Sequence, residues 1–307
     1  MSKSNLLNRK RDILVARNQI IQSLREFFRQ AGYIEVETPH RIPALAPEFH
    51  LDAEPADNWF LHPSPEICMK RLVAAGWHQI YQICKCFRRG ERGSLHLPEF
   101  TLLEWYRAGA DYFDLMKECE HLIRFVARQM GCPDTLSYAG KAIDLSPPWE
   151  RITLREAFDR YATLPLEAAL EEDVFEEVLV DRVEPQLGMV KPTFLYDYPL
   201  AHGALAKRKK ENPYVVERFE LYMAGIELAN AFSELTDPEE QRKRFTDEEE
   251  RRRRAGKVPY PMPEKFLQSL AHMPETAGCA MGIDRLVMLF TDSPLIDLCV
   301  TFTPEEL

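Results

Sequence analysis

The sequence predicts an α+β fold in which a mainly antiparallel sheet is flanked by helices. Two patterns support this class: most expected strands are separated by short turns, and amphipathic helical segments are interspersed with them. The composition, 45% hydrophobic and 29% charged, is that of an ordinary globular protein. A chain of 307 residues is long enough to bury one large core without disulfides. We therefore expect one domain over residues 1–307.

Helices are expected where apolar residues recur at helical spacing or where capping residues stand at the right distance. Ser64 can cap a helix whose first turn holds Pro65 and Glu66. Thr153 and Glu156 form a capping-box pattern. The highly charged segment 237–255 predicts a solvated helix with many ion pairs. The complete set of expected helices is 12–31, 64–76, 112–130, a helix from Thr153, and 237–255.

Strands are expected at 33–38, 79–88, 99–107, 193–198 and 218–228. A charged loop with two glycines, residues 89–98, separates the second and third of these and predicts a hairpin with a long tip. Near the C-terminus, residues 278–290 indicate a glycine-bounded strand that leads into a helix.

The charge balance and the cysteines narrow the classes of protein. With 39 Lys and Arg against 49 Asp and Glu, the net charge of −10 argues against a general nucleic-acid binder, although a local basic groove is compatible with it. Seven cysteines without a CxxC pair indicate reduced, buried thiols rather than a metal or redox site. The chain begins without a signal-peptide pattern and has no long apolar run, so we expect a cytoplasmic protein that does not enter a membrane.

The hairpin at 87–106 is the first candidate for chemistry. Arg88 and Arg89 stand at the end of a strand, and the planar fork of arginine suits phosphate. On the second strand, Glu99 and Glu104 point to opposite faces, so we expect at least one of them in a polar cavity or a buried ion pair. The alternative is an exposed hairpin with surface ion pairs.

The second candidate is the segment 225–237. Glu227 and Glu234 stand in otherwise apolar sequence, and buried carboxylates need cations or metals as partners. Two carboxylates together with substrate phosphates are a common way to hold Mg²⁺. The alternative is a pair of structural salt bridges.

The third candidate is the segment 277–289. Gly278 and Gly282 bound a strand and allow a ligand to approach its backbone. Asp284 can cap the next helix. Arg285 falls in the first turn, where a cation opposes the helix dipole unless an anion is bound. The alternative is an exposed arginine without a role.

Four motifs occur in an order that closely resembles the catalytic domain of class II lysyl-tRNA synthetases, from about Arg11 to the C-terminus. They are EVETP (35–39), FRR…HLPEFTLLEWY (87–106), GIELANAFSEL (225–235) and GIDRLVML (282–289). Those synthetases carry an OB-type anticodon-binding domain before this region, and here we expect none. The segment SPEICMKRL (64–72) is similar to a truncated branch, the elongation factor P (R)-β-lysine ligases.

The resemblance implies an ATP-dependent ligase that forms a β-lysyl or lysyl adenylate and transfers the group to a lysine of elongation factor P rather than to tRNA. It also implies a homodimer built on the helix and strand that end at Thr38-Pro39. Two other functions stay open. One is a lysine-activating ligase with another acceptor, such as a tRNA or a small molecule. The other is a non-catalytic paralogue that binds or regulates a partner.

The resemblance also implies roles for single residues. Arg88 would bind the α-phosphate and Arg285 the γ-phosphate of ATP, which favours attack at the α-phosphorus. Glu227 and Glu234 would hold Mg²⁺, and Glu234 would also meet the ammonium group of the substrate. The remaining implied positions are Ser64, Pro65, Glu66 and Tyr106 for the amino acid, and Arg89, Gly90, His96, Leu97, Leu228, Phe232 and Gly282 for the nucleotide.

This chain departs from the pattern of the synthetases at four places, one of which is Ala231, where they have a glycine after the asparagine that corresponds to Asn230. Ala280 adds a methyl group where they have glycine, as in the β-lysine ligases, and one methyl group can shift discrimination by about 1–3 kcal/mol. We therefore expect β-lysine to be preferred over α-lysine. Gly90 stands where the family has the glutamate that faces adenine, and Glu91 reaches that face only if Gly90 forms a bulge. Leu97 replaces an asparagine.

Overall fold

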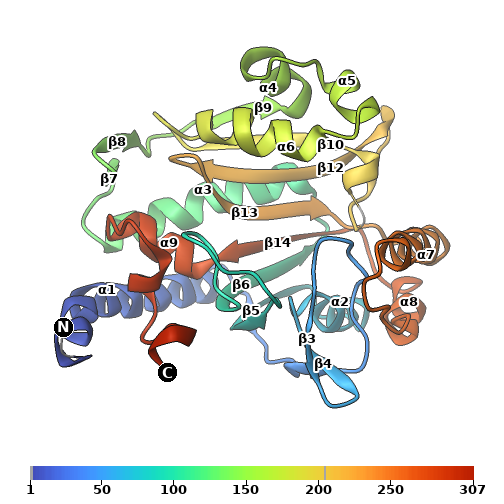
Figure 1. Ribbon diagram of the computed structural model, residues 1–307, viewed down its shortest axis with the longest axis horizontal. Helices are drawn as coiled ribbons and strands as arrows, with labels where there is room; N and C mark the ends of the chain where they lie inside the picture. The colour runs from blue at the N-terminus through green and yellow to red at the C-terminus, as the bar shows by residue number, and fades with distance from the viewer. Residues whose placement is uncertain (1–2, 204) are drawn as a thin grey trace.

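The computed structural model describes residues 3–203 and 205–307. Within them, the centre of the molecule is a nine-stranded sheet with the order β1-β5-β6-β14-β13-β12-β10-β9, and β11 pairs with β12 (Figure 1). All neighbouring strands are antiparallel except β1 with β5 and β9 with β10. The predicted mainly antiparallel α+β class is confirmed. The strands are β1 (Ile34–Glu35), β5 (Gln79–Phe87), β6 (Glu99–Ala108), β9 (Glu150–Thr153), β10 (Thr193–Pro199), β11 (Arg208–Lys209), β12 (Asn212–Met223), β13 (Ile226–Ser233) and β14 (Thr276–Gly282).

Two small sheets and a set of helices complete the described chain. One small sheet has the order β2-β4-β3 and the other pairs β7 with β8. Their strands are β2 (Arg41–Ile42), β3 (Glu54–Ala56), β4 (Trp59–Leu61), β7 (Thr135–Tyr138) and β8 (Lys141–Asp144). The α-helices are α1 (Lys3–Gln30), α2 (Glu66–Ala74), α3 (Tyr112–Gln129), α4 (Leu154–Tyr161), α5 (Leu166–Glu171), α6 (Phe175–Val178), α7 (Pro238–Arg254), α8 (Glu264–Leu270) and α9 (Ile283–Phe290).

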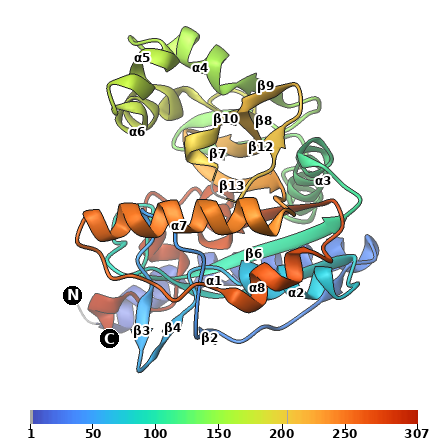
Figure 2. The ribbon, with the colours of Figure 1, turned by 90° about the vertical axis from the view of Figure 1, so that its right-hand side faces the viewer.

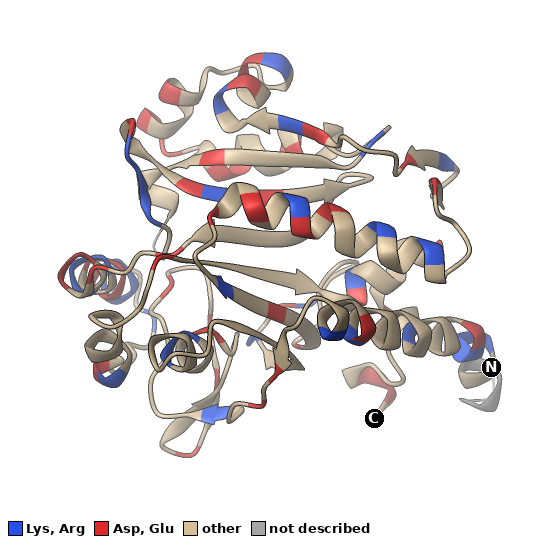
Figure 3. Ribbon diagram, turned by 180° about the vertical axis from the view of Figure 1, so that it is seen from behind, with Lys and Arg blue, Asp and Glu red and all other residues tan. Residues whose placement is uncertain are grey.

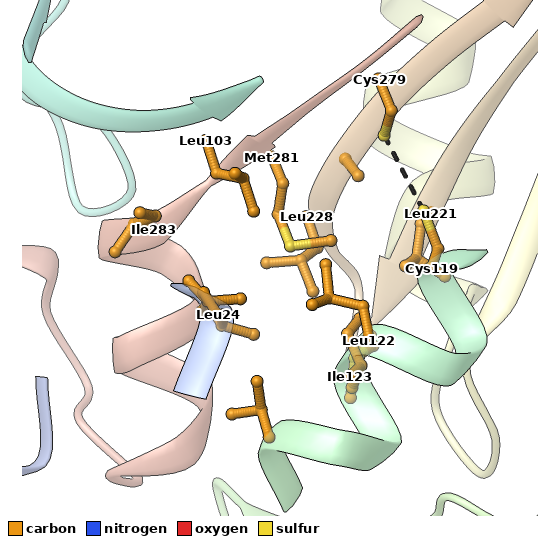
Figure 4. Close-up of a cluster of buried hydrophobic side chains, with 14 of the residues drawn as sticks. Leu24, Leu103, Cys119, Leu122, Ile123, Leu221, Leu228, Cys279, Met281 and Ile283 are labelled. Atoms are coloured by element: carbon orange, nitrogen blue, oxygen red, sulfur yellow. Dashed lines mark hydrogen bonds between the residues drawn. The ribbon is translucent and has the colours of Figure 1, made fainter. Parts of the chain in front are cut away.

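The two faces of the large sheet have different environments because side chains alternate along each strand. Leu103 and Trp105 of β6 belong to a buried cluster with residues of α1, α3 and α9. Figure 3 shows α3 lying across this face of the sheet, with α1 beside it. Figure 4 shows part of this core, in which the thiols of Cys119 and Cys279 approach to 3.8 Å. The neighbouring residues of β6, Leu102 and Glu104, point to the opposite face and line a cavity.

One expected strand, 218–228, is wrong, because the structure has a hairpin there. Strand β12 ends at Met223 and β13 begins at Ile226, with Ala224 and Gly225 both at positive φ between them. Positive φ at both central residues is the geometry of a two-residue hairpin turn whose twist matches that of the flanking strands. An apolar run with a single glycine hid this turn from the sequence analysis.

The helix predicted over 237–255 is α7, and its cap is Asp237, which accepts the backbone N–H groups of Glu239 and Glu240. The helix packs beside α8 at one side of the molecule (Figure 2). Its expected solvation holds for only part of its surface, because Phe245 and Arg252 are completely buried. No described helix is long and apolar enough to cross a membrane.

Candidate functional site

A cavity of about 430 Å³ lies on the face of the sheet opposite α3. Strands β6, β13 and β14 form its floor, and the beginning of α2 and the loop before β6 contribute to its walls. The cavity brings together most of the predicted site residues: Ser64, Glu66, Arg88, His96, Leu97, Tyr106, Glu227, Leu228, Phe232, Glu234, Ala280, Gly282 and Arg285.

One end of the cavity is acidic and built from three elements. Glu66 comes from the first turn of α2, Glu104 from β6, and Glu234 directly follows β13. Glu104 accepts hydrogen bonds from the hydroxyl groups of Tyr106, at 2.5 Å, and Ser64, at 2.8 Å. The expectation that Glu99 or Glu104 points into a polar cavity is confirmed, because Glu104 is buried in the cavity and Glu99 is exposed. Three carboxyl groups therefore converge from segments far apart in the sequence.

A single ammonium group lies between these acids. Lys70, one helical turn after Glu66, forms ion pairs with Glu66 and Glu234, and its side chain is 2% exposed. Burial opposes the charge, but Glu234 and Glu66 overcome it and raise the pKa of Lys70 above its usual value. Apart from this ammonium group, neither carboxylate oxygen of Glu234 has a partner among the described residues.

The single positive charge of Lys70 does not balance the negative charge of the carboxyl groups around it. Burial and the nearby Glu66 raise the pKa of Glu104 to about 8, although its bonds from Tyr106 and Ser64 oppose this. The same two causes, burial first, raise the pKa of Glu48 to about 7 at the edge of this cluster. Carboxyl groups that stay protonated near neutral pH mark a site in which cationic charge is missing. This end of the cavity is therefore suited to a ligand with one or more ammonium groups.

The other end of the cavity is basic. Arg285, in the first turn of α9, donates to the Glu227 carboxylate at 3.0 Å and to the Glu227 carbonyl at 2.7 Å, and lies 2.7 Å from His96 Nε2. Arg88 packs over the ring of Phe100 at 5.0 Å, and its buried Nε has no partner in the described chain. Burial, followed by the charge of Arg285, lowers the pKa of His96, so the imidazole is neutral at physiological pH. Two guanidinium groups beside a neutral imidazole fit a polyphosphate.

The turn after β5 explains how Glu91 reaches this end. Gly90 has φ +78°, and the N–H of Glu91 donates to the Arg88 carbonyl at 3.4 Å. The turn brings Glu91 into the cavity wall, 3.8 Å from Arg88. A tight turn at Gly90 thus places Glu91 in the cavity wall, a position that the sequence analysis expected only if Gly90 formed a bulge. Arg89 and Gly90 do not line the cavity.

The predicted helix start is shifted by one residue. Pro65 is the N-cap of α2 and lies outside the cavity wall, while Ser64 Oγ accepts the Glu66 N–H at 3.0 Å. The expected cap of α9 is also different. Asp284 instead accepts from Arg17, at 2.5 Å, and from the backbone N–H of Thr101, at 2.7 Å. These bonds tie the start of α9, and so Arg285, to α1 and β6.

The expectation that Glu227 and Glu234 hold one Mg²⁺ ion does not fit the strand geometry. Seven residues along a strand separate them by about 20 Å, beyond the reach of a single ion. A register shift opposite Leu221 and Tyr222 changes the side-chain alternation, so that both residues still line the cavity. Glu184 instead lies in the electrostatic field of both Glu227 and Glu220.

This second acidic group is a better fit for a cation. Burial, then the charges of Glu220 and Glu227, raise the pKa of Glu184 to about 7. A bound Mg²⁺ would relieve this repulsion, and Glu227 would be its protein ligand on the cavity wall. When bound there, the ion supplies charge neutralisation for a polyphosphate.

Close packing shapes the acidic end. A Cβ atom on Gly278 would lie 2.5 Å from Glu234 Oε1 and would overlap the Tyr106 ring. Phe232, which the resemblance places beside the base, lines the cavity and lies 5.0 Å from the ammonium group of Lys70. Ala280 packs against a small buried cluster that includes Leu102 and lines the cavity.

The sequence analysis missed the wall residues Glu48, Arg218 and Arg251, and it missed Lys70, which pairs with Glu66 and Glu234. Only Lys70 had a detectable signal, because it stands four residues after Glu66 in a predicted helix, the spacing of an intrahelical ion pair. The others depend on loops and on strand pairings that bring distant segments together.

The antiparallel sheet and its polar cavity define a class of protein, and comparison with known proteins identifies the same class. The family model described as tRNA synthetases class II (D, K and N) matches residues 5–306. The chain belongs to this family.

Two groups of relatives are similar to it. A lysine–tRNA ligase of Moorella thermoacetica is 39% identical over 96% of this chain and 66% of the relative. An elongation factor P–(R)-β-lysine ligase of Erwinia tasmaniensis is 39% identical over 95% of both chains, and one of Edwardsiella ictaluri is 37% identical with the same coverage. The chain thus spans about two thirds of the length of the lysine–tRNA ligases it matches.

Proposed function

We propose that this protein is an ATP-dependent, AMP-forming ligase that activates (R)-β-lysine and transfers it to a lysine side chain of elongation factor P. The observation that supports this most is the polarity of the cavity, with an excess of carboxyl groups at one end and arginines at the other. A diamino acid offers two ammonium groups and one carboxylate, and ATP offers the phosphates. The elongation factor P ligases, which match over nearly their full length, support the choice of acceptor.

In this proposal the acidic end holds the amino acid. Glu66, Glu104 and Glu234 bind its ammonium groups, and the hydroxyl groups of Ser64 and Tyr106 fix Glu104 through the bonds described above. Lys70 lies between Glu66 and Glu234, forms an ion pair with each, and neutralises part of their charge. The substrate carboxylate is then directed toward the basic end, which holds its reaction partner.

At the basic end, Arg88 binds the α-phosphate and Arg285 the γ-phosphate of ATP. The substrate carboxylate attacks the α-phosphorus, pyrophosphate leaves, and the aminoacyl adenylate remains. The arginines stabilise the charge that develops during this displacement. In the second half-reaction, the neutral amine of the acceptor lysine attacks the activated carbonyl, an amide bond forms, and AMP leaves.

The experiment that tests the proposal has two parts. ATP–pyrophosphate exchange is measured with (R)-β-lysine and with α-lysine, and the mass of elongation factor P is measured after incubation with ATP, Mg²⁺ and either amino acid. We expect exchange that is stronger with β-lysine, and a mass increase of one lysyl group. Equal or better exchange with α-lysine would contradict the proposed preference for β-lysine. An unmodified elongation factor P would contradict the proposed acceptor. No exchange with either amino acid would contradict the proposed ligase activity.

We also propose a cytoplasmic homodimer formed through α1 and β1. The exposed apolar side chains of Leu7, Val15 and Ile34 support this, since each is at least 42% exposed on these two elements. Sedimentation velocity tests it: we expect a dimer that Val15→Glu converts to a monomer, and a monomeric unsubstituted protein would contradict it.

A further inference from the structure

Two cysteines and two histidines lie together beside the cavity, and neither the proposed reaction nor the comparisons use them. Cys84 and Cys86 point to the same face of β5, His62 directly follows β4, and His40 precedes β2. The two thiols and His62 are buried, and His40 is exposed. Because three separate segments contribute, the sequence alone showed only the two thiols.

The distances within the cluster are close to those of a metal centre. The two Sγ atoms are 3.9 Å apart, and His62 Nε2 lies 3.9 Å from Cys84 Sγ and 4.0 Å from Cys86 Sγ. The ligand atoms of His40, His62 and Cys84 all lie within 4.8 Å of one another. Tetrahedral Zn²⁺ with two sulfur and two nitrogen ligands needs separations of about 3.3–3.8 Å. A small contraction brings the two thiols and His62 into this range, and the exposed His40 must move closer to complete the site.

The hydrogen bonding leaves room for such a ligand. His62 Nε2 lies 2.8 Å from the Lys85 carbonyl, and His62 Nδ1 is buried without a partner among the described residues. Because Nε2 is also the nitrogen nearest the two thiols, it would exchange its contact with the Lys85 carbonyl for the ion, and the ring proton would then lie on Nδ1.

We propose that His40, His62, Cys84 and Cys86 bind one Zn²⁺ ion. Two thiolates, two neutral imidazoles and one divalent cation sum to zero charge, which suits a buried position. The exposed side of His40 provides the path by which the ion enters.

The backbone already joins the contributing segments. The N–H of His62 donates to the His40 carbonyl at 2.8 Å, and the N–H of Phe87 donates to the His62 carbonyl at 3.0 Å. The thiols also pack against Leu102, Phe100 and Ala280, which line the cavity. The ion would therefore fasten the end of β5, which leads to Arg88, to the segment that leads to Ser64. Its role is to position these two parts of the site.

The test uses the full chain, purified under reducing conditions, stripped with a chelator and titrated with Co²⁺. We expect sulfur-to-cobalt charge-transfer and visible d–d absorption that saturates at one ion per chain and is displaced by Zn²⁺. Cys84→Ser and Cys86→Ser should abolish this absorption, and His40→Ala should weaken binding. The matched control is Cys119→Ala, because Cys119 and Cys279 form a thiol pair at 3.8 Å without a histidine.

Thermal melting checks that each variant folds, and Zn²⁺ should raise the Tm of the unsubstituted protein and of Cys119→Ala only. Absence of the absorption, or an equal spectrum in the Cys84→Ser and Cys86→Ser variants, would overturn the proposal. A disulfide between Cys84 and Cys86 in the purified, unreduced protein that persists with Zn²⁺ present would also overturn it. None of these measurements depends on amino-acid activation, so they are independent of the proposed function.

Discussion

Glu104→Gln should remove most of the pH dependence of amino-acid binding. In the free protein, burial raises the pKa of Glu104 to about 8, so the carboxyl group is mainly protonated at neutral pH. A bound ammonium group favours the ionised form, and binding therefore releases a proton. The affinity should fall as the pH falls below 8.

The size of this effect follows from the pKa. With a value of about 8, about one Glu104 in ten is ionised at pH 7 and about one in a hundred at pH 6. The KM for the amino acid should therefore rise about tenfold per pH unit, or about 1.4 kcal/mol, as the pH falls from about 8 to about 6. Glu48, whose pKa is raised to about 7, adds a weaker dependence below that pH which the substitution leaves in place.

The assay is amino-acid-dependent ATP–pyrophosphate exchange at a series of pH values, with the KM for ATP as an internal reference. Glu99→Gln is the matched control, because Glu99 begins the same strand but is exposed and pairs with Lys85 at 3.4 Å. It should retain the pH dependence of the unsubstituted protein. A flat KM in the unsubstituted protein, or an unchanged slope in Glu104→Gln, would refute the reasoning.

The other predictions concern the packing and charge of the acidic end. Ala280→Gly should shift the ratio of kcat/KM for β-lysine over α-lysine toward α-lysine by about 1–3 kcal/mol, as measured by exchange with each. Gly278→Ala should force Tyr106 and Glu234 to move, costing about 1–3 kcal/mol in a denaturant titration and raising the KM for the amino acid more than that for ATP. Lys70→Met should destabilise the fold by about 3–5 kcal/mol, because it leaves two buried carboxylates without their cation.

Specific results would contradict each of these three. An unchanged substrate ratio in Ala280→Gly would show that the methyl group does not discriminate. An equal rise of both KM values in Gly278→Ala would indicate general misfolding. A neutral Lys70→Met would show that Glu66 and Glu234 are not charged together.

The raised carboxyl pKa values also set a pH dependence of stability. Glu104 and Glu48 have an ordinary pKa of 4.5 and a higher one in the folded chain. Their contribution to stability is therefore complete below pH 4.5 and is lost as the pH rises through about 7 and 8. A bound diamino acid compensates for this loss, so it should raise the Tm more at about pH 8 than at about pH 6. An equal rise at both pH values would argue against ionisation on binding.

The amino-acid sequence by itself determined the local features of this protein. Alternation along β6 predicted that Glu99 and Glu104 point to opposite faces, the capping box of Thr153 and Glu156 predicted α4, and the charge pattern predicted α7. These patterns depend on neighbours within a few residues, so they can be recognised in one segment. The turn at Ala224 and Gly225 was missed because an apolar run continues on both sides of it.

Only the tertiary structure decided which side chains share a site and how they ionise. Glu66, Glu104 and Glu234 come from three separate segments, and Lys70 meets Glu234 only because α2 packs against β6 beside the cavity. The raised pKa of Glu104 results from burial and from Glu66, neither of which a strand pattern contains. The separation of Glu227 from Glu234 likewise depends on β13, because Glu227 lies near its start and Glu234 directly follows its end. Local sequence sets backbone direction, whereas the electric environment of a charge depends on every segment packed around it.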